Sequence, residues 1–100
     1  MSLDKNLTVH PALRDTVTSG GTVEVALPSG TEYFIIEEEG GAGDIHWGVT
    51  EAYADSATQC HTVSASGTSG VIAANPPSVW INASGGDVDY YIFVVRQGKT

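Results

Sequence analysis

The residues best suited to transition-metal chemistry are three histidines and a single cysteine: His10, His46, Cys60 and His61. Structural zinc sites usually take ligand pairs that lie two to four residues apart. Cys60 and His61 are adjacent, so on a strand their side chains point to opposite faces. The spacing therefore predicts no metal site, and it favours a small packed cysteine and ordinary polar histidines.

The carboxylates suggest calcium binding or glycoside hydrolysis, and neither pattern is complete. Asp87 and Asp89 would share one face of a strand, but calcium takes six to eight oxygen ligands and no compact ligand loop surrounds them. Nothing in the sequence sets two glutamates at the separation that a glycosidase needs. No serine lies in a Gly-x-Ser-x-Gly elbow. We expect no catalytic residues and no cofactor, and hence no enzyme; the glutamates considered are Glu32, Glu37, Glu38 and Glu51.

Aromatic side chains are the remaining candidates for binding, and here three interpretations stay open. Trp47 stands on the apolar side of an alternating segment, so we expect it in the core. Trp80 has polar neighbours on its own face, Ser78 and Asn82. It either packs against the final strand, anchors a subunit interface or forms a sugar platform with a nearby tyrosine such as Tyr53 or Tyr91. Packing or interface contact is favoured, because large aromatic side chains usually pack.

The strongest structural signal is the last apolar run, residues 87–97, which predicts a strand. Side chains alternate along a strand, so Tyr91, Phe93 and Val95 share one face and their neighbours in the run share the other. Both faces are apolar, and an edge strand of this composition would promote aggregation. We therefore expect a central strand with the core on one side. The second side would be covered by another layer or by another subunit.

Turn clusters recur about every ten residues and helical periodicity is almost absent. The sequence therefore predicts an all-β fold, an antiparallel β-sandwich or jelly roll of about eight strands with little or no helix. Segment 31–38 is the best neighbour for 87–97, and 78–83 is expected to form a hairpin with it. Gly48 is expected to mark a bulge or a close approach of another backbone. The expected strands are 7–10, 22–27, 31–38, 44–53, 58–65, 71–74, 78–83 and 87–97.

A chain of 100 residues fits one sandwich domain over 1–100, in which residues 1–20 are a candidate extended arm. One cysteine allows no disulfide within the chain, so packing or oligomerisation must stabilise the fold. The net charge is −8, and no lysine or arginine lies between Asp15 and Val95. Such a surface disfavours nucleic acid and anionic membranes as partners. No export signal is recognisable at the start, so we expect synthesis and use without export.

The second half of the chain resembles small virion proteins of tailed bacteriophages. The likeness covers residues 44–97 and rests on the run 45–50, a glycine-rich loop, the segment 78–86 with Trp80, and the final apolar strand. These proteins are β-sandwich or jelly-roll modules, often trimeric, that decorate capsids or serve as tail and fibre accessories. The resemblance supplies no catalytic residues.

What the resemblance implies is a structural role in a phage virion. We expect a capsid decoration or cement subunit that forms a small homo-oligomer, such as a trimer, and binds phage capsid or tail proteins. It would be made in the host cytoplasm and end in the virion. The interface residues we expect are Trp80, Tyr91 and Phe93. The alternative is a carbohydrate- or receptor-binding β-sandwich module of a tail or fibre.

Overall fold

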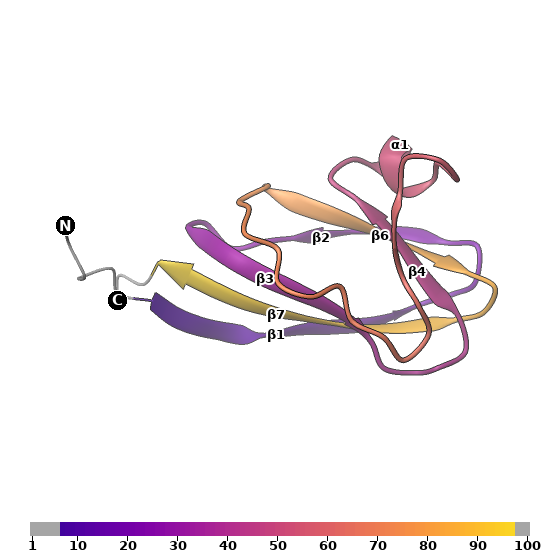
Figure 1. The fold of residues 1–100 in the computed structure, drawn as a ribbon, viewed down its shortest axis with the longest axis horizontal. Coiled ribbons are helices and arrows are strands. Elements are labelled where there is room, and N and C mark those ends of the chain that lie inside the picture. Colours follow the sequence, from indigo (N-terminus) through magenta and orange to yellow (C-terminus); the bar gives the residue numbers. More distant parts are fainter. Residues whose placement is uncertain (1–6, 98–100) are drawn as a thin grey trace.

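Two antiparallel sheets pack face to face in the computed structural model, which describes residues 7–97 (Figure 1). Sheet A has three strands in the order β1-β7-β3, and sheet B has four in the order β2-β6-β4-β5. The all-β sandwich is therefore confirmed. The elements are β1 (Leu7–Val17), β2 (Thr22–Ala26), β3 (Thr31–Glu38), β4 (Asp44–Gly48), α1 (Glu51–Ala54), β5 (His61–Val63), β6 (Ser78–Ser84) and β7 (Val88–Gln97).

Strand β7 is the central strand of sheet A, as its composition predicts. It pairs with β1 on one side and with β3 on the other, and β3 has the predicted bounds. Val88, Ile92 and Val94 are fully buried between the sheets. The alternating pattern thus produces one buried face, as expected for a strand beneath a second layer.

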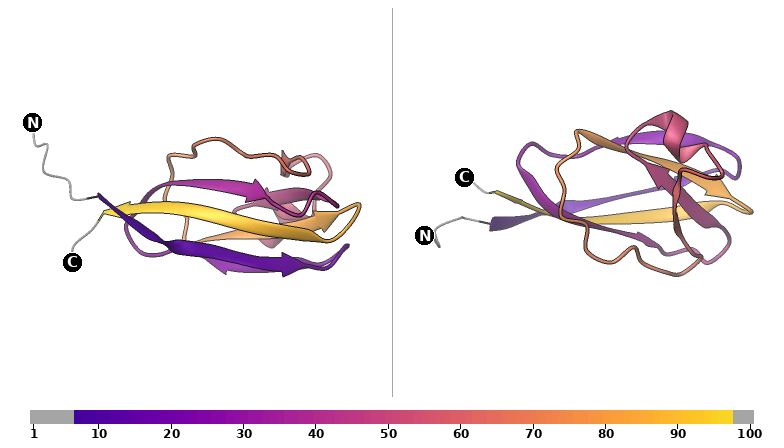
Figure 2. Two further views of the ribbon diagram at one scale, coloured as in Figure 1. Left: turned by 90° about the horizontal axis from the view of Figure 1, so that it is seen from below. Right: turned by 45° about the horizontal axis from the view of Figure 1, so that its top comes forward.

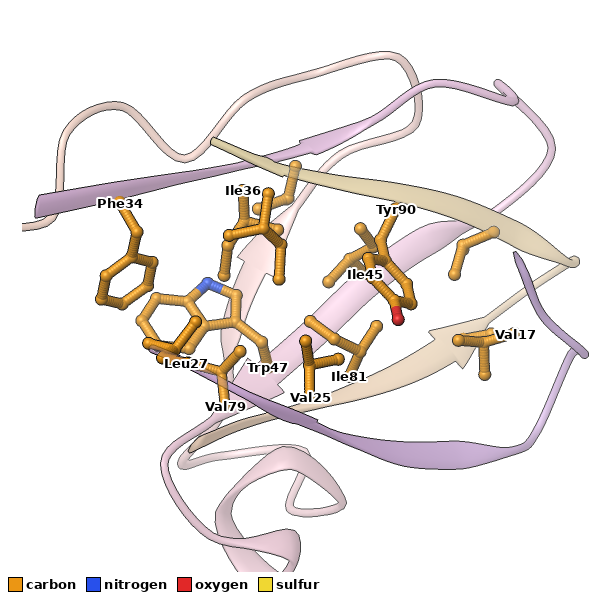
Figure 3. Close-up of a cluster of buried hydrophobic side chains, with 14 of the residues drawn as sticks. Val17, Val25, Leu27, Phe34, Ile36, Ile45, Trp47, Val79, Ile81 and Tyr90 are labelled. Carbon is orange, nitrogen blue, oxygen red and sulfur yellow. The ribbon is translucent and has the colours of Figure 1, made fainter. Parts of the chain in front are cut away.

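The core lies between the inner faces of the two sheets (Figure 3). Phe34 and Ile36 from β3 meet Ile45 and Trp47 from β4, and the rings of Phe34 and Trp47 contact edge to face at 6.1 Å. Trp47 is only 7% exposed, which confirms its predicted place in the core. Burial of these side chains supplies the main driving force for folding. The single cysteine allows no disulfide within the chain to add to it.

The hairpin predicted between 78–83 and 87–97 is wrong. β6 lies in sheet B and β7 in sheet A, so the turn between them crosses from one sheet to the other. A β-carbon on Gly86 would overlap the carbonyl of Ala42, and one on Gly43 would overlap the carbonyl of Gly86. The two loops cross in direct backbone contact, which only glycine permits at these positions.

The predicted strand 44–53 is too long, because the chain turns into helix α1 after Gly48. Thr50 caps the helix, with its hydroxyl accepting the Tyr53 amide at 3.1 Å. The helix folds back over sheet B, where a β-carbon on Gly48 would lie 2.6 Å from the Tyr53 β-carbon and 2.9 Å from the Ala54 nitrogen. The close backbone approach predicted at Gly48 is thereby confirmed.

Two of the predicted strands are shorter in the structure than the sequence predicts. Segment 58–65 contributes only β5, and segment 71–74 forms a single bridge, between Ile72 and Phe34. Residues 67–72 instead run along the free edge of β3. Ser69 and Ile72 donate their amides to Ile36 and Phe34 at 2.8 Å. This segment satisfies backbone groups that an edge strand would leave open.

Residues 7–17 of the predicted arm form β1, which pairs with β7 along its length, so this part is a strand of the sheet. Residues 1–6 lie outside the described residues. β1 is an edge strand with a register shift between His10 and Leu13, at Pro11. A proline and a bulge are features that discourage pairing with further strands. Among residues 7–97, no helix has the length and apolarity needed to cross a bilayer.

Candidate functional site

The outer face of sheet A carries an apolar patch. Antiparallel register places side chains that lie opposite each other on the same face. Val95 therefore stands between Val9 and Tyr33, and Phe93 stands beside Ile35. The left view of Figure 2 looks at this side of the molecule, where β1, β7 and β3 lie side by side. We call this surface the outer face; its apolar members are Leu7, Val9, Tyr33, Ile35, Tyr91, Phe93 and Val95.

The outer face keeps much of its contact with water. Val9 is 63% exposed, Leu7 40% and Tyr33 37%, whereas Phe93 and Val95 are half-buried. The inner residues of the same strand, Ile92 and Val94, are fully buried. The second packed surface expected on 87–97 therefore has no complete cover among residues 7–97. A contiguous exposed apolar patch is a common mark of an interaction site.

One row of the outer face is charged. Tyr91 stands between Arg14 on β1 and Glu37 on β3. The Arg14 guanidinium lies 4.7 Å from the Tyr91 ring centroid, a cation–π distance, and its Nη2 lies 3.6 Å from a carboxylate oxygen of Glu39. The apolar rows at Phe93 and Val95 are thus bordered at one end by a cation and a carboxylate on opposite sides of a tyrosine.

Beyond this row, a shallow polar hollow of about 290 Å³ opens at the end of the sheet. The Thr16 hydroxyl donates to Asp89 there at 2.6 Å. Burial, together with the neighbouring Asp15 carboxylate, raises the pKa of Tyr90 above its ordinary value. No group of three potential metal ligands comes together among residues 7–97. The hollow is lined by Arg14, Asp15, Thr16, Glu39, Asp89 and Tyr90.

The three predicted contact residues do not form one surface. Tyr91 and Phe93 share the outer face of sheet A, whereas Trp80 lies on β6 in sheet B. Trp80 is half-buried, and its register partners are Glu24 and Gly48. Its inward-facing neighbours Val79 and Ile81 are fully buried, so Trp80 faces away from the core. That Trp80 contacts a partner stays a prediction, and such a contact would lie on sheet B rather than on sheet A.

A lateral groove follows the free edge of sheet B. His61 on β5 stacks on Trp47, with ring centroids 4.6 Å apart, and a hollow lies on each side of it. The hollow of about 330 Å³ is lined by Gly48, Val49, Tyr53, Gln59 and His61. The hollow of about 440 Å³ is lined by Trp47, His61, Thr62, Ser69 and Ile72. We call the two together the lateral groove; its lining is aromatic and polar and carries no aspartate, glutamate, lysine or arginine.

Sequence reasoning missed the structural role of Glu38, considered above only as a catalytic carboxylate. Glu38 is 2% exposed and accepts four backbone amides. Gly41 and Ser66 donate to one oxygen at 2.6 and 2.9 Å, and Gly40 and Asp89 to the other at 2.9 and 3.0 Å. Burial alone would raise the pKa of Glu38, but the four amides outweigh it and hold the pKa below its ordinary value.

The signal that could have revealed this role is the alternation of β3. Phe34, Ile36 and Glu38 fall on one face, and a glycine-rich loop follows. A carboxylate in line with a buried stripe must find donors, and glycine amides are accessible ones. Glu38 thus ties the end of β3 to β7 and to the loop at residue 66, and the geometry assigns it a structural role.

A scan against protein-family models finds no match, and a search of curated proteins finds no similar sequence. The functional argument therefore rests on the surfaces described above.

Proposed function

We propose that this protein is a non-enzymatic structural subunit that self-associates through the outer face of sheet A and works as part of a larger assembly. The observation that carries the proposal is the two-faced apolar composition of β7. One of its faces is buried in the core, and the other remains partly open to water at Tyr91, Phe93 and Val95. Covering apolar area is the main source of association free energy.

The finer role we propose is a capsid decoration or cement subunit of a tailed phage. It is supported by the resemblance over residues 44–97, together with the acidic net charge and the two-layered fold. The trimer that the resemblance suggests would need contacts between two different surfaces, whereas the outer face pairing with itself gives a dimer. The oligomeric state separates these two arrangements.

The test is the mass in solution by analytical ultracentrifugation, from about 1 μM to about 1 mM, a range suited to interfaces at the small end of the known sizes. We expect a reversible oligomer that Phe93→Thr dissociates, because threonine keeps the strand propensity and removes the aromatic ring. The matched control is Tyr53→Ala, which removes an exposed aromatic from α1. A wild-type monomer throughout the range would contradict self-association.

The decoration role has its own measurement. Antibodies against the protein, bound to gold particles, should label purified virions at regularly spaced capsid positions. Labelling confined to the tail would favour a tail accessory. Absence of the protein from purified virions would contradict a virion role while leaving the self-association result intact.

A second candidate function is carbohydrate binding, and the lateral groove is the observation that favours it. Tyr53 is 45% exposed beside Gln59 and His61, with the Thr62 and Ser69 side chains in the adjoining hollow. Aromatic faces with neutral hydrogen-bonding groups suit an uncharged polyhydroxylated ligand. Trp80, the aromatic of the sugar platform considered from the sequence, is half-buried on β6 and lies outside the lateral groove.

The saccharide candidate is tested with an array of neutral oligosaccharides followed by titration calorimetry. Tyr53→Ala should lower the affinity of any hit about tenfold or more, since a stacked ring contributes about 1–2 kcal/mol. Tyr33→Thr on the outer face of sheet A is the matched control and should leave the affinity unchanged. An array without signal removes this candidate.

A further inference from the structure

The charged row of the outer face determines how two copies can fit together. In a face-to-face pair of aligned sheets related by a two-fold axis, the axis lies between the faces, either along the strands or across them. An axis along β7 places β1 of one copy over β3 of the other and keeps each row opposite itself. An axis across β7 places β1 over β1 and reverses the order of the rows.

The two arrangements treat Arg14 differently. With the axis across the strands and centred at Phe93, Arg14 faces Val9 of the second copy and Glu37 faces Tyr33, as the register requires. Each charge is then covered by an apolar side chain of the second copy, which removes water from it without adding a partner and therefore weakens association. With the axis along β7, Arg14 of each copy faces Glu37 of the other.

We propose that a second copy packs on the outer face of sheet A about a two-fold axis parallel to β7, so that Arg14 of each copy pairs with Glu37 of the other. This inference rests on the proposed function and deepens it. The apolar rows at Phe93 and Val95 meet their own counterparts at the centre. The cation–π contact of Arg14 with Tyr91 holds the guanidinium over the row before association.

Two further charges of this face, Glu39 and Asp89, lie toward one end of it. Arg14 already reaches Glu39 within its own chain at 3.6 Å, and Glu39 is at the end of the sheet where the polar hollow opens. The proposed axis places Asp89 of one copy opposite Asp89 of the other. Within each copy, the Thr16 hydroxyl donates to Asp89. This pair lies at the rim of the contact, beside the polar hollow, so water screens it.

The size of the face predicts how tight the dimer is. Ten residues of β7 at about 3.3 Å each and three strands at about 4.8 Å give a flat area on the order of 500 Å² per copy. Two such faces bury roughly 1,000 Å², at the lower limit for a specific interface. We therefore expect a dissociation constant in the micromolar range rather than a permanent dimer.

The test uses charge reversal, and its decisive form is a mixture. Arg14→Glu leaves acidic groups at both positions, and Glu37→Arg leaves basic groups at both. Each variant alone should dimerise about tenfold more weakly than the wild type, since two unfavourable pairs form per dimer. Mixed together they should form a heterodimer within about threefold of wild-type affinity, because both cross pairs are then attractive. The double variant should also recover wild-type affinity.

The control for net charge is Glu51→Arg, which makes the same change on α1. A mixture of Glu51→Arg and Arg14→Glu should contain no more heterodimer than the self-association of each variant alone predicts. Failure of the Arg14→Glu and Glu37→Arg mixture to associate would overturn the proposed axis, as would a wild-type trimer. The proposed function would survive either result if Phe93→Thr still dissociates the oligomer, so the two failures are distinguishable.

Discussion

The outer faces of the two sheets differ in what covers them. On sheet B, α1 folds back over β4, and Asp55 accepts the Thr22 hydroxyl at 2.6 Å while Asn82 donates to Thr22 at 2.9 Å. On sheet A, most of the outer side chains are apolar, and Leu7, Val9 and Tyr33 are open to water. An outer face that is polar and covered by its own chain completes its interactions within the molecule. The apolar, open face of sheet A is the one that has association free energy to gain.

Among the variants that test this difference between the two sheets, Gly48→Ala should have the largest effect on stability. The new β-carbon would overlap Tyr53 and Ala54, so α1 must shift away from sheet B. We expect a loss of about 2–4 kcal/mol in the free energy of unfolding, measured by urea denaturation, in the range of overpacking and strain effects. Gly70→Ala is the control: Gly70 has open space around it, so only its positive φ opposes a side chain, and we expect a loss of about 1 kcal/mol. Equal losses for both variants would show that α1 is not tightly held.

The next largest effect should come from Glu38→Gln, which acts where the end of β3 is tied to β7 and to the loop at residue 66. The amide keeps one acceptor oxygen but places an NH₂ group against backbone donors, which leaves buried amides unsatisfied. We expect a loss of about 2–3 kcal/mol at pH 7. Glu37→Gln, on the exposed side of the same strand, should cost less than about 0.5 kcal/mol.

Glu38 also predicts a pH dependence of stability. The pKa of Glu38 in the folded protein lies below its ordinary value, so its contribution is complete above the ordinary glutamate pKa of about 4.3. The contribution is lost as the pH falls below that value and through the lowered folded-state pKa. Urea denaturation between pH 7 and pH 3 should show a smaller acid loss for Glu38→Gln than for the wild type. Parallel curves would contradict the role of the four amides.

A smaller effect should follow removal of the polar network on sheet B. Asp55→Ala removes the acceptor for the Thr22 hydroxyl and for the weaker Asn82 contact at 3.4 Å. Because these groups are partly exposed, water replaces the lost bonds, and we expect a cost of about 1 kcal/mol. Dimerisation should be unaffected, since the network is on the sheet opposite to the outer face. A change in the dissociation constant would instead implicate sheet B in association.

The smallest effect on stability should come from Val9→Thr on the outer face. Val9 is 63% exposed, and threonine keeps its shape and strand propensity, so stability should change by less than about 0.5 kcal/mol. The dimer should weaken about threefold to tenfold, because the hydroxyl would face apolar rows at the contact. An unchanged dissociation constant would place Val9 outside the interface.

The sequence predicts the centre of sheet A well and the connections poorly. The alternation of residues 88–95 and of 31–38 is a local property, and it correctly predicts a central strand and its neighbour. Whether Gly85 and Gly86 form a hairpin or cross between sheets depends on contact with Ala42 and Gly43, far away in the chain. A short glycine turn is compatible with both outcomes, so local pattern cannot choose between them.

The candidate site divides in the same way. Tyr91 and Phe93 are found on one face, because that face follows directly from their spacing. The placement of Arg14 and Glu37 on either side of Tyr91 depends on the register of three strands, which a single sequence does not reveal. The role of Glu38 depends on donors from residues 66 and 89, and its local neighbours give only the hint that it lies on a buried stripe.

The pairing of β1 with β7 has a consequence for how the protein is made. Sheet A joins the first described strand to the last, with β3 on the far side of β7. Neither β1 nor β3 has its partner strand in the sheet until β7 has left the ribosome. Contacts of such long sequence separation slow folding, and sheet A cannot be completed before β7 has been synthesised. During synthesis the nascent chain therefore exposes its apolar strands. Its high acidic charge would help to keep it soluble in that interval.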